Sequence, residues 1–248
     1  MGLDNISITA LITVRSTSSR LPGKCFLPFG QGSVLEHVIN RAHHYGLDPV
    51  ICTTQDGEDD RIAGLASRLG IRCFRGSRIN KLQRWNDCCH EFGIEAFHSV
   101  DADDPFFCGD EVRRSFALLE SGYDMIAPAP SSSSGGATVG YSLRAEIVEK
   151  ACIGLHYETD TEMMWSYIER VPGIRKIILG EPLTAIIHAR MTLDYPEDYV
   201  LLEAVRLIVG NLASREQIAD VLERNPDLTE INAFRSSEWS ENQRKKSL

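Results

Sequence analysis

Short apolar runs alternate with amphipathic stretches along the first half of the chain, and this alternation constrains the fold more than any other feature. The runs typical of buried strands are residues 6–14, 49–54, 71–75 and 96–100. Apolar residues at helical spacing predict intervening helices over 33–45, 58–69, 79–92 and 110–119. Strands that alternate with helices at this spacing predict an α/β fold with a mostly parallel central sheet and helices on both faces.

The pattern changes in the second half of the chain, after a strand predicted over residues 123–127. Residues 128–136 are rich in Pro, Ser and Gly, which favours a mobile loop beside a site. We expect residues 137–190 to form a small inserted α+β subdomain that covers the site. The elements expected in it are strands over 138–143 and 175–179 and helices over 145–152 and 161–170.

The chain is expected to return to the main sheet near the end of this insertion. The elements predicted there are a strand over 186–193 and helices over 196–209 and 214–224. Pro196 suits the first turn of a helix. The polar residues 236–248 are expected to be disordered, so we predict one domain over residues 1–235 followed by a tail.

Charge, cysteine usage and hydropathy exclude several kinds of protein. A formal net charge of −9 argues against binding bulk nucleic acid or an anionic membrane, because both need a basic surface. The 7 cysteines lack the spacing of metal ligands, which indicates reduced thiols. No apolar run approaches the roughly 20 residues that span a bilayer, and no signal peptide is evident, so we expect a cytoplasmic protein.

The segment Arg15-Ser-Thr-Ser-Ser-Arg-Leu-Pro-Gly-Lys24, directly after the first predicted strand, points to a ligand. Small residues let the backbone approach a ligand closely, and their N–H groups can point at phosphate oxygens. Arg15, Arg20 and Lys24 can add charge-assisted hydrogen bonds to a polyanion such as a nucleoside triphosphate. The alternative is a polar loop with solvated cations, but three cations in so short a loop favour phosphate binding.

Carboxylates follow two of the predicted strands. Asp101, Asp103 and Asp104 come after the strand over 96–100, and Asp194 comes after the strand over 186–193. Ligands of parallel sheets sit at the carboxyl ends of the strands, and Mg²⁺ prefers hard oxygen ligands such as carboxylates. The alternatives are an acidic turn and, for Asp194, a helix N-cap. Together with the cationic loop, the carboxylates favour a site for a metal and phosphates.

Several segments, which follow one another along the chain in the same order as in the family, resemble the cytidylyltransferases that make CMP-activated sugar acids. That family includes CMP-KDO synthetases, acylneuraminate cytidylyltransferases and the SpsF-like branch of spore-coat polysaccharide biosynthesis. Besides residues 10–24, the segments that carry the resemblance are 35–41, 53–60, 74–77, 103–105, 190–198 and 225–232.

The resemblance implies a Rossmann-like nucleotidyltransferase fold, with CTP as substrate, Mg²⁺ as cofactor and a homodimer whose interface includes residues 137–190. Arg15, Arg20 and Lys24 are expected to hold the triphosphate, and Asp103 and Asp194 the metal. The residues expected near the nucleoside are Leu11, Ile12, Thr13, Arg75 and Gly76. Asp101 is expected to take part as a base or as a partner of the metal carboxylates.

The predicted reaction is attack by an acceptor hydroxyl on the α-phosphate of CTP, with release of pyrophosphate, catalysed by Arg15, Lys24, Asp103 and Asp194. The acceptor is expected to be a 2-keto-3-deoxy sugar acid used for a surface polysaccharide. Gln83 and residues 162–166 depart from the SpsF-like pattern. Two alternatives therefore stay open: a nucleotidyltransferase with another nucleotide or a sugar phosphate acceptor, and a nucleotide-binding module without turnover.

Overall fold

The computed structural model describes residues 7–182 and 189–246. These residues form a central sheet and the helices around it. The seven-stranded sheet has the order β5-β4-β1-β6-β8-β7-β9. Its strands are β1 (Thr9–Thr13), β4 (Asp48–Thr54), β5 (Arg72–Gly76), β6 (Ala96–Asp101), β7 (Met125–Ala127), β8 (Ser142–Arg144) and β9 (Lys176–Ile178). All neighbouring pairs are parallel except those of β8, which runs antiparallel to β6 and β7. A hairpin of β2 (Pro28–Phe29) and β3 (Gly32–Ser33) stands apart.

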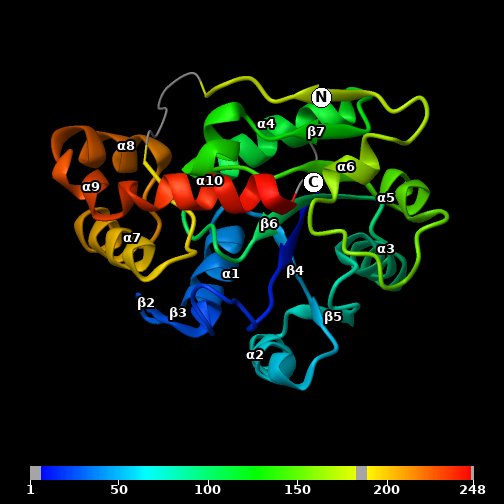
Figure 1. The fold of residues 1–248 in the computed structure, drawn as a ribbon, viewed down its shortest axis with the longest axis horizontal. Helices are drawn as coiled ribbons and strands as arrows, with labels where there is room; N and C mark the ends of the chain where they lie inside the picture. The colour runs from blue at the N-terminus through cyan, green and yellow to red at the C-terminus, as the bar shows by residue number, and fades with distance from the viewer. Residues whose placement is uncertain (1–6, 183–188, 247–248) are drawn as a thin grey trace.

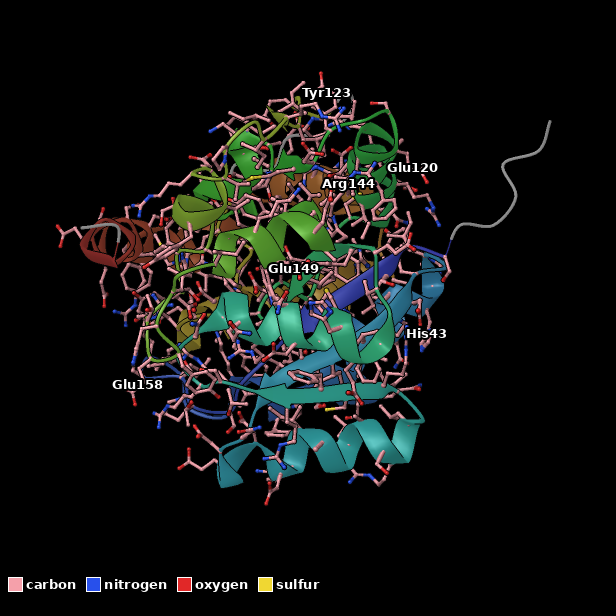
Figure 2. All side chains as sticks on the ribbon, turned by 90° about the vertical axis from the view of Figure 1, so that its right-hand side faces the viewer. His43, Glu120, Tyr123, Arg144, Glu149 and Glu158 are labelled. Carbon is pink, nitrogen blue, oxygen red and sulfur yellow. The ribbon has the colours of Figure 1, made fainter. Side chains whose placement is uncertain are left out.

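Helices cover both faces of the sheet, as the alternating pattern predicts. One face packs against α1 (Val34–His44), α2 (Asp60–Leu69) and α4 (Gly109–Glu120), and the other against α3 (Lys81–Phe92), α5 (Ala145–Cys152) and α6 (Trp165–Ile168). Figure 2 looks onto this second face, where α3 lies beside α5. Ala10 and Ile12 of β1 point into the first core and Leu11 into the second, because side chains of a strand alternate between its faces.

The end of the described chain forms a third helical cluster, to the left in Figure 1. It consists of α7 (Pro196–Val209), α8 (Arg215–Arg224) and α9 (Asp227–Ala233). The last helix, α10 (Arg235–Lys246), crosses the front of the molecule in the same view. Figure 1 therefore shows α10 running from this cluster toward the middle of the molecule.

The described residues of the expected insertion, 137–182 and 189–190, contribute to the main fold. Strands β8 and β9 belong to the central sheet, and α5 packs on α3. The helix expected over 161–170 shortens to α6, and a π-helical turn over Ser132–Gly136 lies within the expected loop. The expected interface role of this segment stays a prediction.

Two further expectations differ from the structure near the end of the chain. Part of the strand expected over 186–193 lies outside the described residues, and residues 189–193 form no strand. Instead, Met191 N donates to Gly135 O and Leu193 N to Asp103 O, at 2.8 and 2.7 Å. Within the tail expected to be disordered, residues 236–246 belong to α10, whose first residue, Arg235, pairs with Glu197 at 3.0 Å and lies over the Tyr195 ring.

Candidate active site

The segment after β1 folds back on itself and exposes backbone donors. Gly23 adopts a left-handed φ of 67° and donates its N–H to Ser16 O at 3.0 Å, which closes the turn. Among the described residues, the backbone N–H groups of Thr17, Ser19 and Arg20 meet no hydrogen-bond partner. These three residues line a large cleft, so their donors are available to an anion.

A buried carboxylate that the sequence reasoning did not assign anchors this loop. Asp59 accepts hydrogen bonds from Ser16 N at 2.8 Å and Ser16 Oγ at 2.7 Å, and its second oxygen accepts from Thr54 Oγ1. Burial raises the pKa of Asp59, but these hydrogen bonds outweigh it and hold the pKa below its ordinary value. A buried acceptor at this position fixes where the loop leaves the sheet.

Lys24 joins the loop to both carboxylates predicted to hold the metal. Its Nζ lies 2.5 Å from Asp103 Oδ2 and 3.0 Å from Asp194 Oδ1, and it donates to Leu193 O at 2.8 Å. Burial lowers the pKa of Lys24, but the charges of Asp103 and Asp194 outweigh it and raise the pKa above the ordinary value. The predicted convergence of Lys24, Asp103 and Asp194 is therefore what the structure contains.

Asp194 is buried and surrounded by cations. Besides Lys24, it meets Arg20 Nη2 at 2.6 Å and Arg190 Nη2 at 3.1 Å. Burial raises its pKa, but the charges of Lys24 and Arg20 outweigh it, and the pKa lies below the ordinary value. The N-cap position of α7 is instead Tyr195, whose N–H donates to the Asp198 carboxylate at 2.9 Å. The Asp194 side chain thus belongs to the site.

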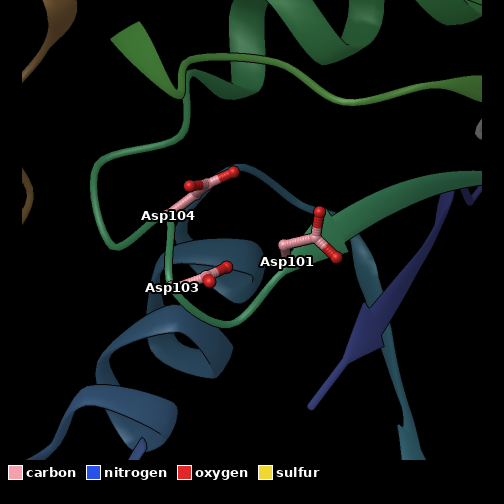
Figure 3. A group of neighbouring side chains, drawn as sticks. All are labelled: Asp101, Asp103 and Asp104. Carbon is pink, nitrogen blue, oxygen red and sulfur yellow. The ribbon is translucent and has the colours of Figure 1, made fainter. Parts of the chain in front are cut away.

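Three carboxylates gather at the end of β6, as Figure 3 shows. Oxygens of Asp101, Asp103 and Asp104 all lie within 4.8 Å of one another. Burial and the charges of Asp103 and Asp101 raise the pKa of Asp104 well above its ordinary value. Hard oxygens that crowd together in this way suit a divalent cation, which would offset their repulsion. Asp104, which the sequence analysis noted only as part of the acidic run, joins the candidate ligands.

The structure separates the residues expected near the nucleoside: one of them lines the cleft, and the others do not. The backbones of Leu11 and Ile12 pair with β4 and β6, and their side chains are fully buried, so only Thr13 of this group lines the cleft. Arg75 turns away to Thr54 O at 3.0 Å and Asp60 at 2.7 Å. Arg75 and Gly76 do not line the cleft, because β5 is the edge strand of the sheet on that side.

The cleft has a volume of about 1150 Å³, and a second set of residues lines it, which includes Lys81 and residues of the segment 162–166 that departs from the SpsF-like pattern. Lys81 is buried at the start of α3, where its Nζ lies 3.3 Å from Asp101 Oδ1 and over the Trp85 ring. The segment before β8 contributes Tyr141, and the segment around α6 contributes Glu162 and Trp165. Lys81 lies in the first turn of the helix predicted over 79–92, where a lysine carries no sequence signal of burial, so the fold is what brings it to the cleft.

Arg15 bridges the two sides of the cleft. Its Nη2 lies 3.7 Å from Glu162 Oε2, and both side chains are more than one-third exposed. The predicted triphosphate cations therefore separate into two groups: Arg20 and Lys24 meet the carboxylates, whereas Arg15 meets the segment before α6.

In the described part of the chain, no helix is long and apolar enough to cross a membrane.

Comparison with known proteins shows the family of the chain. Residues 9–134 match the model of the family described as cytidylyltransferase. The spore coat polysaccharide biosynthesis protein SpsF of Bacillus subtilis is 26% identical over 233 residues, which cover 89% of this chain and 95% of SpsF. The family match over residues 9–134 spans the loop after β1 and the carboxylates that follow β6.

Solved structures share the fold. A cytidylyltransferase from Leptospira borgpetersenii matches with a TM-score of 0.77 at 21% identity, over 90% of this chain and 97% of that one. A CMP:2-keto-3-deoxy-manno-octonic acid synthetase complexed with CTP matches with a TM-score of 0.59 at 14% identity, over 82% and 99%. The chain belongs to the cytidylyltransferase family and is a nucleotidyltransferase.

Proposed function

We propose that this enzyme transfers CMP from CTP to a sugar acid and releases pyrophosphate, in a reaction that depends on Mg²⁺. The observation that carries the proposal is the meeting of Lys24, Asp103 and Asp194 at one point of the cleft. A cation from the loop after β1 and two carboxylates from distant parts of the chain can together bind one metal-bound triphosphate. The relative SpsF, whose name refers to spore coat polysaccharide, and the synthetase solved with CTP support a sugar acid and CTP.

The loop after β1 holds the triphosphate in this proposal. Arg20 and Lys24 neutralise the β- and γ-phosphates, and the backbone N–H groups of Thr17 and Ser19 donate to their oxygens. Asp59 keeps the loop in this shape. Because the donors are oriented before the substrate binds, little reorganisation is needed as charge develops on the leaving pyrophosphate.

The carboxylates fit a magnesium ion, because the set consists of hard oxygen donors close together and beside the phosphate loop. Asp103 and Asp194 would hold it, with Asp101 and Asp104 next to them. When bound, the ion neutralises charge on the α-phosphate and the departing pyrophosphate. Arg190 keeps Asp194 in position through the contact between Nη2 and Oδ2 at 3.1 Å.

The acceptor hydroxyl forms the new bond to the α-phosphorus as the bond to the pyrophosphate oxygen breaks. The hydroxyl proton passes to a base, and we assign this role to Asp101, a carboxylate of the cleft that pairs with Lys81 rather than with Lys24. The products are a CMP-sugar acid and pyrophosphate, so atoms and charge balance without another reactant. Arg15 and Glu162 stand between the two substrates and help to align them.

The test is release of pyrophosphate from CTP with Mg²⁺ and a panel of sugar acids. Asp103→Ala and Asp194→Ala should each lower kcat by about a hundredfold or more, the scale of losing one preorganised electrostatic group. Asp110→Ala is the matched control, because this carboxylate is exposed on α4 and forms only a surface pair with Arg113. Unchanged turnover in the two variants would contradict the metal assignment.

The two alternatives predict different results. A panel of CTP, UTP, GTP and ATP in a thermal-shift assay should give the largest rise in Tm with CTP, because a tight ligand stabilises the folded state by mass action. A larger shift with another nucleotide would favour the first alternative. Binding of CTP without pyrophosphate release from any acceptor would favour the binding module.

A further inference from the structure

Two aromatic side chains stand parallel in the wall of the cleft. The ring centroids of Tyr141 and Trp165 are 6.2 Å apart and their planes differ by 7°. Both residues line the cleft and are half-buried. Tyr141 precedes β8 and bonds to β6 through Ser99 N, which donates to Tyr141 O at 2.8 Å, whereas Trp165 begins α6. We call these two residues the aromatic pair.

The polar atoms of the aromatic pair have no partner in the part of the chain that the structure describes. Within the described residues, neither the Tyr141 hydroxyl nor the Trp165 indole N–H meets a hydrogen-bond partner. Other aromatic groups nearby do find one: Trp85 Nε1 donates to Thr13 Oγ1 at 2.9 Å. Both donors reach solvent beside the apolar ring faces, so they are open to a ligand that enters the cleft.

The geometry of the reaction assigns this wall to the acceptor. Displacement at phosphorus proceeds with the attacking and leaving oxygens roughly in line, so the acceptor enters opposite the pyrophosphate. The cations that face the pyrophosphate follow β1, the aspartates follow β6, and Tyr141 precedes β8. Because β6 lies between β1 and β8 in the sheet, the aromatic pair stands across the aspartates from Lys24.

Charged groups around the aromatic pair indicate the chemistry of its ligand. Asp101 and Glu162 offer carboxylate oxygens, and Lys81 Nζ donates to Asp101 at 3.3 Å with further ammonium protons to offer. Hydroxyl groups donate to carboxylates, an acid group pairs with an ammonium, and the C–H face of a sugar ring packs on an aromatic ring. Together these groups match a cyclic sugar acid better than an open polar chain.

We propose that the aromatic pair is the platform on which the ring of the acceptor sugar packs, and that Tyr141 and Trp165 determine acceptor selectivity. This inference rests on the proposed function and specifies its acceptor end. The triphosphate is assigned to the loop after β1, so the platform should contribute to the affinity for the sugar and leave the affinity for CMP unchanged. The ring faces supply contact area and the two donors orient the sugar.

The test measures the binding of CMP and of CMP-N-acetylneuraminate, a CMP-sugar acid with a ring, by calorimetry. The unaltered protein should bind the CMP-sugar more tightly than CMP. Trp165→Ala and Tyr141→Ala should each weaken binding of the CMP-sugar about threefold to tenfold, the range of an aromatic contact, with CMP unaffected. Trp165→Phe and Tyr141→Phe keep a ring and should retain most of the affinity.

Tyr167→Ala is the matched control, because Tyr167 lies on the same helix, does not line the cleft and bonds only to Asp160 O. It should bind both ligands normally, and the Tm of every variant is measured to confirm folding. Equal affinity of the unaltered protein for CMP and the CMP-sugar would overturn the inference, as would equal losses for both ligands in Trp165→Ala. Equally tight binding of CDP-glycerol, whose acceptor part has no ring, would also overturn it. Failure of CMP and CTP to bind at all would instead overturn the proposed function.

Discussion

At one end of the central cleft Lys24, Asp103 and Asp194 form a network of ion pairs, whereas at the other end Tyr141 and Trp165 present parallel rings. The first network is closed within the protein, since each charge has an opposite charge within 3.0 Å. The second end carries donors that no described residue satisfies. The end with Lys24 therefore selects its ligand by charge, and the end with the aromatic pair selects its ligand by shape and stacking.

This difference shows how one fold can keep a reaction and vary its acceptor. Phosphate and metal chemistry requires particular charges at particular distances, and few side chains can supply them. Packing against a sugar ring tolerates more substitutions, because several aromatic residues have similar faces. Variants at the two ends should consequently change different kinetic constants, and each prediction below tests that separation.

The largest effect is expected for Lys24→Met at the charged end. The change removes a cation from the triphosphate and leaves Asp103 and Asp194 without their shared partner, so kcat/KM for CTP should fall by about a hundredfold or more. Steady-state pyrophosphate release at varied CTP checks this. Lys24→Arg keeps the charge and should recover part of the loss. Normal turnover by Lys24→Met would remove the basis for the charged end.

Gly140→Ala should damage the acceptor end while sparing the charged end. A Cβ at Gly140 would lie 2.1 Å from Ser99 O, so the segment that carries Tyr141 must move away from β6. Overpacking of this kind costs typically ~1–3 kcal/mol of unfolding free energy. We expect a raised acceptor KM with an unchanged thermal shift by CTP. Gly180→Ala, which meets nothing within 4 Å, is the control; a loss of CTP binding in Gly140→Ala would show that the ends are not separate.

Stability should decrease at acid pH through a histidine behind the acceptor end. His98 Nε2 accepts from Gly140 N at 3.1 Å, so Nδ1 carries the proton and donates to Ser142 Oγ at 2.8 Å. Burial lowers the pKa of His98 from 6.5 to about 3. Between these values the unfolded state binds a proton that the folded state does not. The unfolding free energy should therefore fall as pH decreases below 6.5, by up to ~1.4 kcal/mol per pH unit.

The control for this pH dependence is His98→Gln, which has no titrating ring. Its unfolding free energy, measured by urea denaturation from pH 7 to pH 4, should depend less steeply on pH than that of the unaltered protein. Some slope remains, because burial also lowers the pKa of His37 to about 4. Parallel curves for the two proteins would contradict the role of His98.

The smallest effect is expected where the two ends meet, at Arg15 and Glu162. The pair is more than one-third exposed and its atoms are 3.7 Å apart, so solvent screening limits its energy. A double-mutant cycle of Arg15→Gln and Glu162→Gln on unfolding free energy should give a coupling below ~1 kcal/mol. A much larger coupling energy would mean that a change at one end of the cleft alters the other end.

The sequence was sufficient to predict the charged end because its residues follow strands and share a recognisable chemistry. The cationic loop and the aspartates were found in this way. The rest depended on long-range contacts: Asp59 and Lys81 look like ordinary surface charges in the sequence, and Trp165 lies in a helix too short for a periodic signal. Helix α10 was missed because its stability comes from contacts such as that between Arg235 and Glu197 rather than from an apolar stripe.

The two members of the aromatic pair have unequal supports. Tyr141 is fastened to the sheet by hydrogen bonds from Ser99 N and to Ser99 Oγ, at 2.8 and 2.9 Å, whereas Trp165 stands on a helix of one turn. To change the acceptor, an engineer should leave Tyr141 in place and diversify Trp165 and Met163, which line the cleft, and should keep the core residues Met164 and Ile168. Libraries at these cleft positions can alter acceptor preference while the packing of the hydrophobic core stays unchanged.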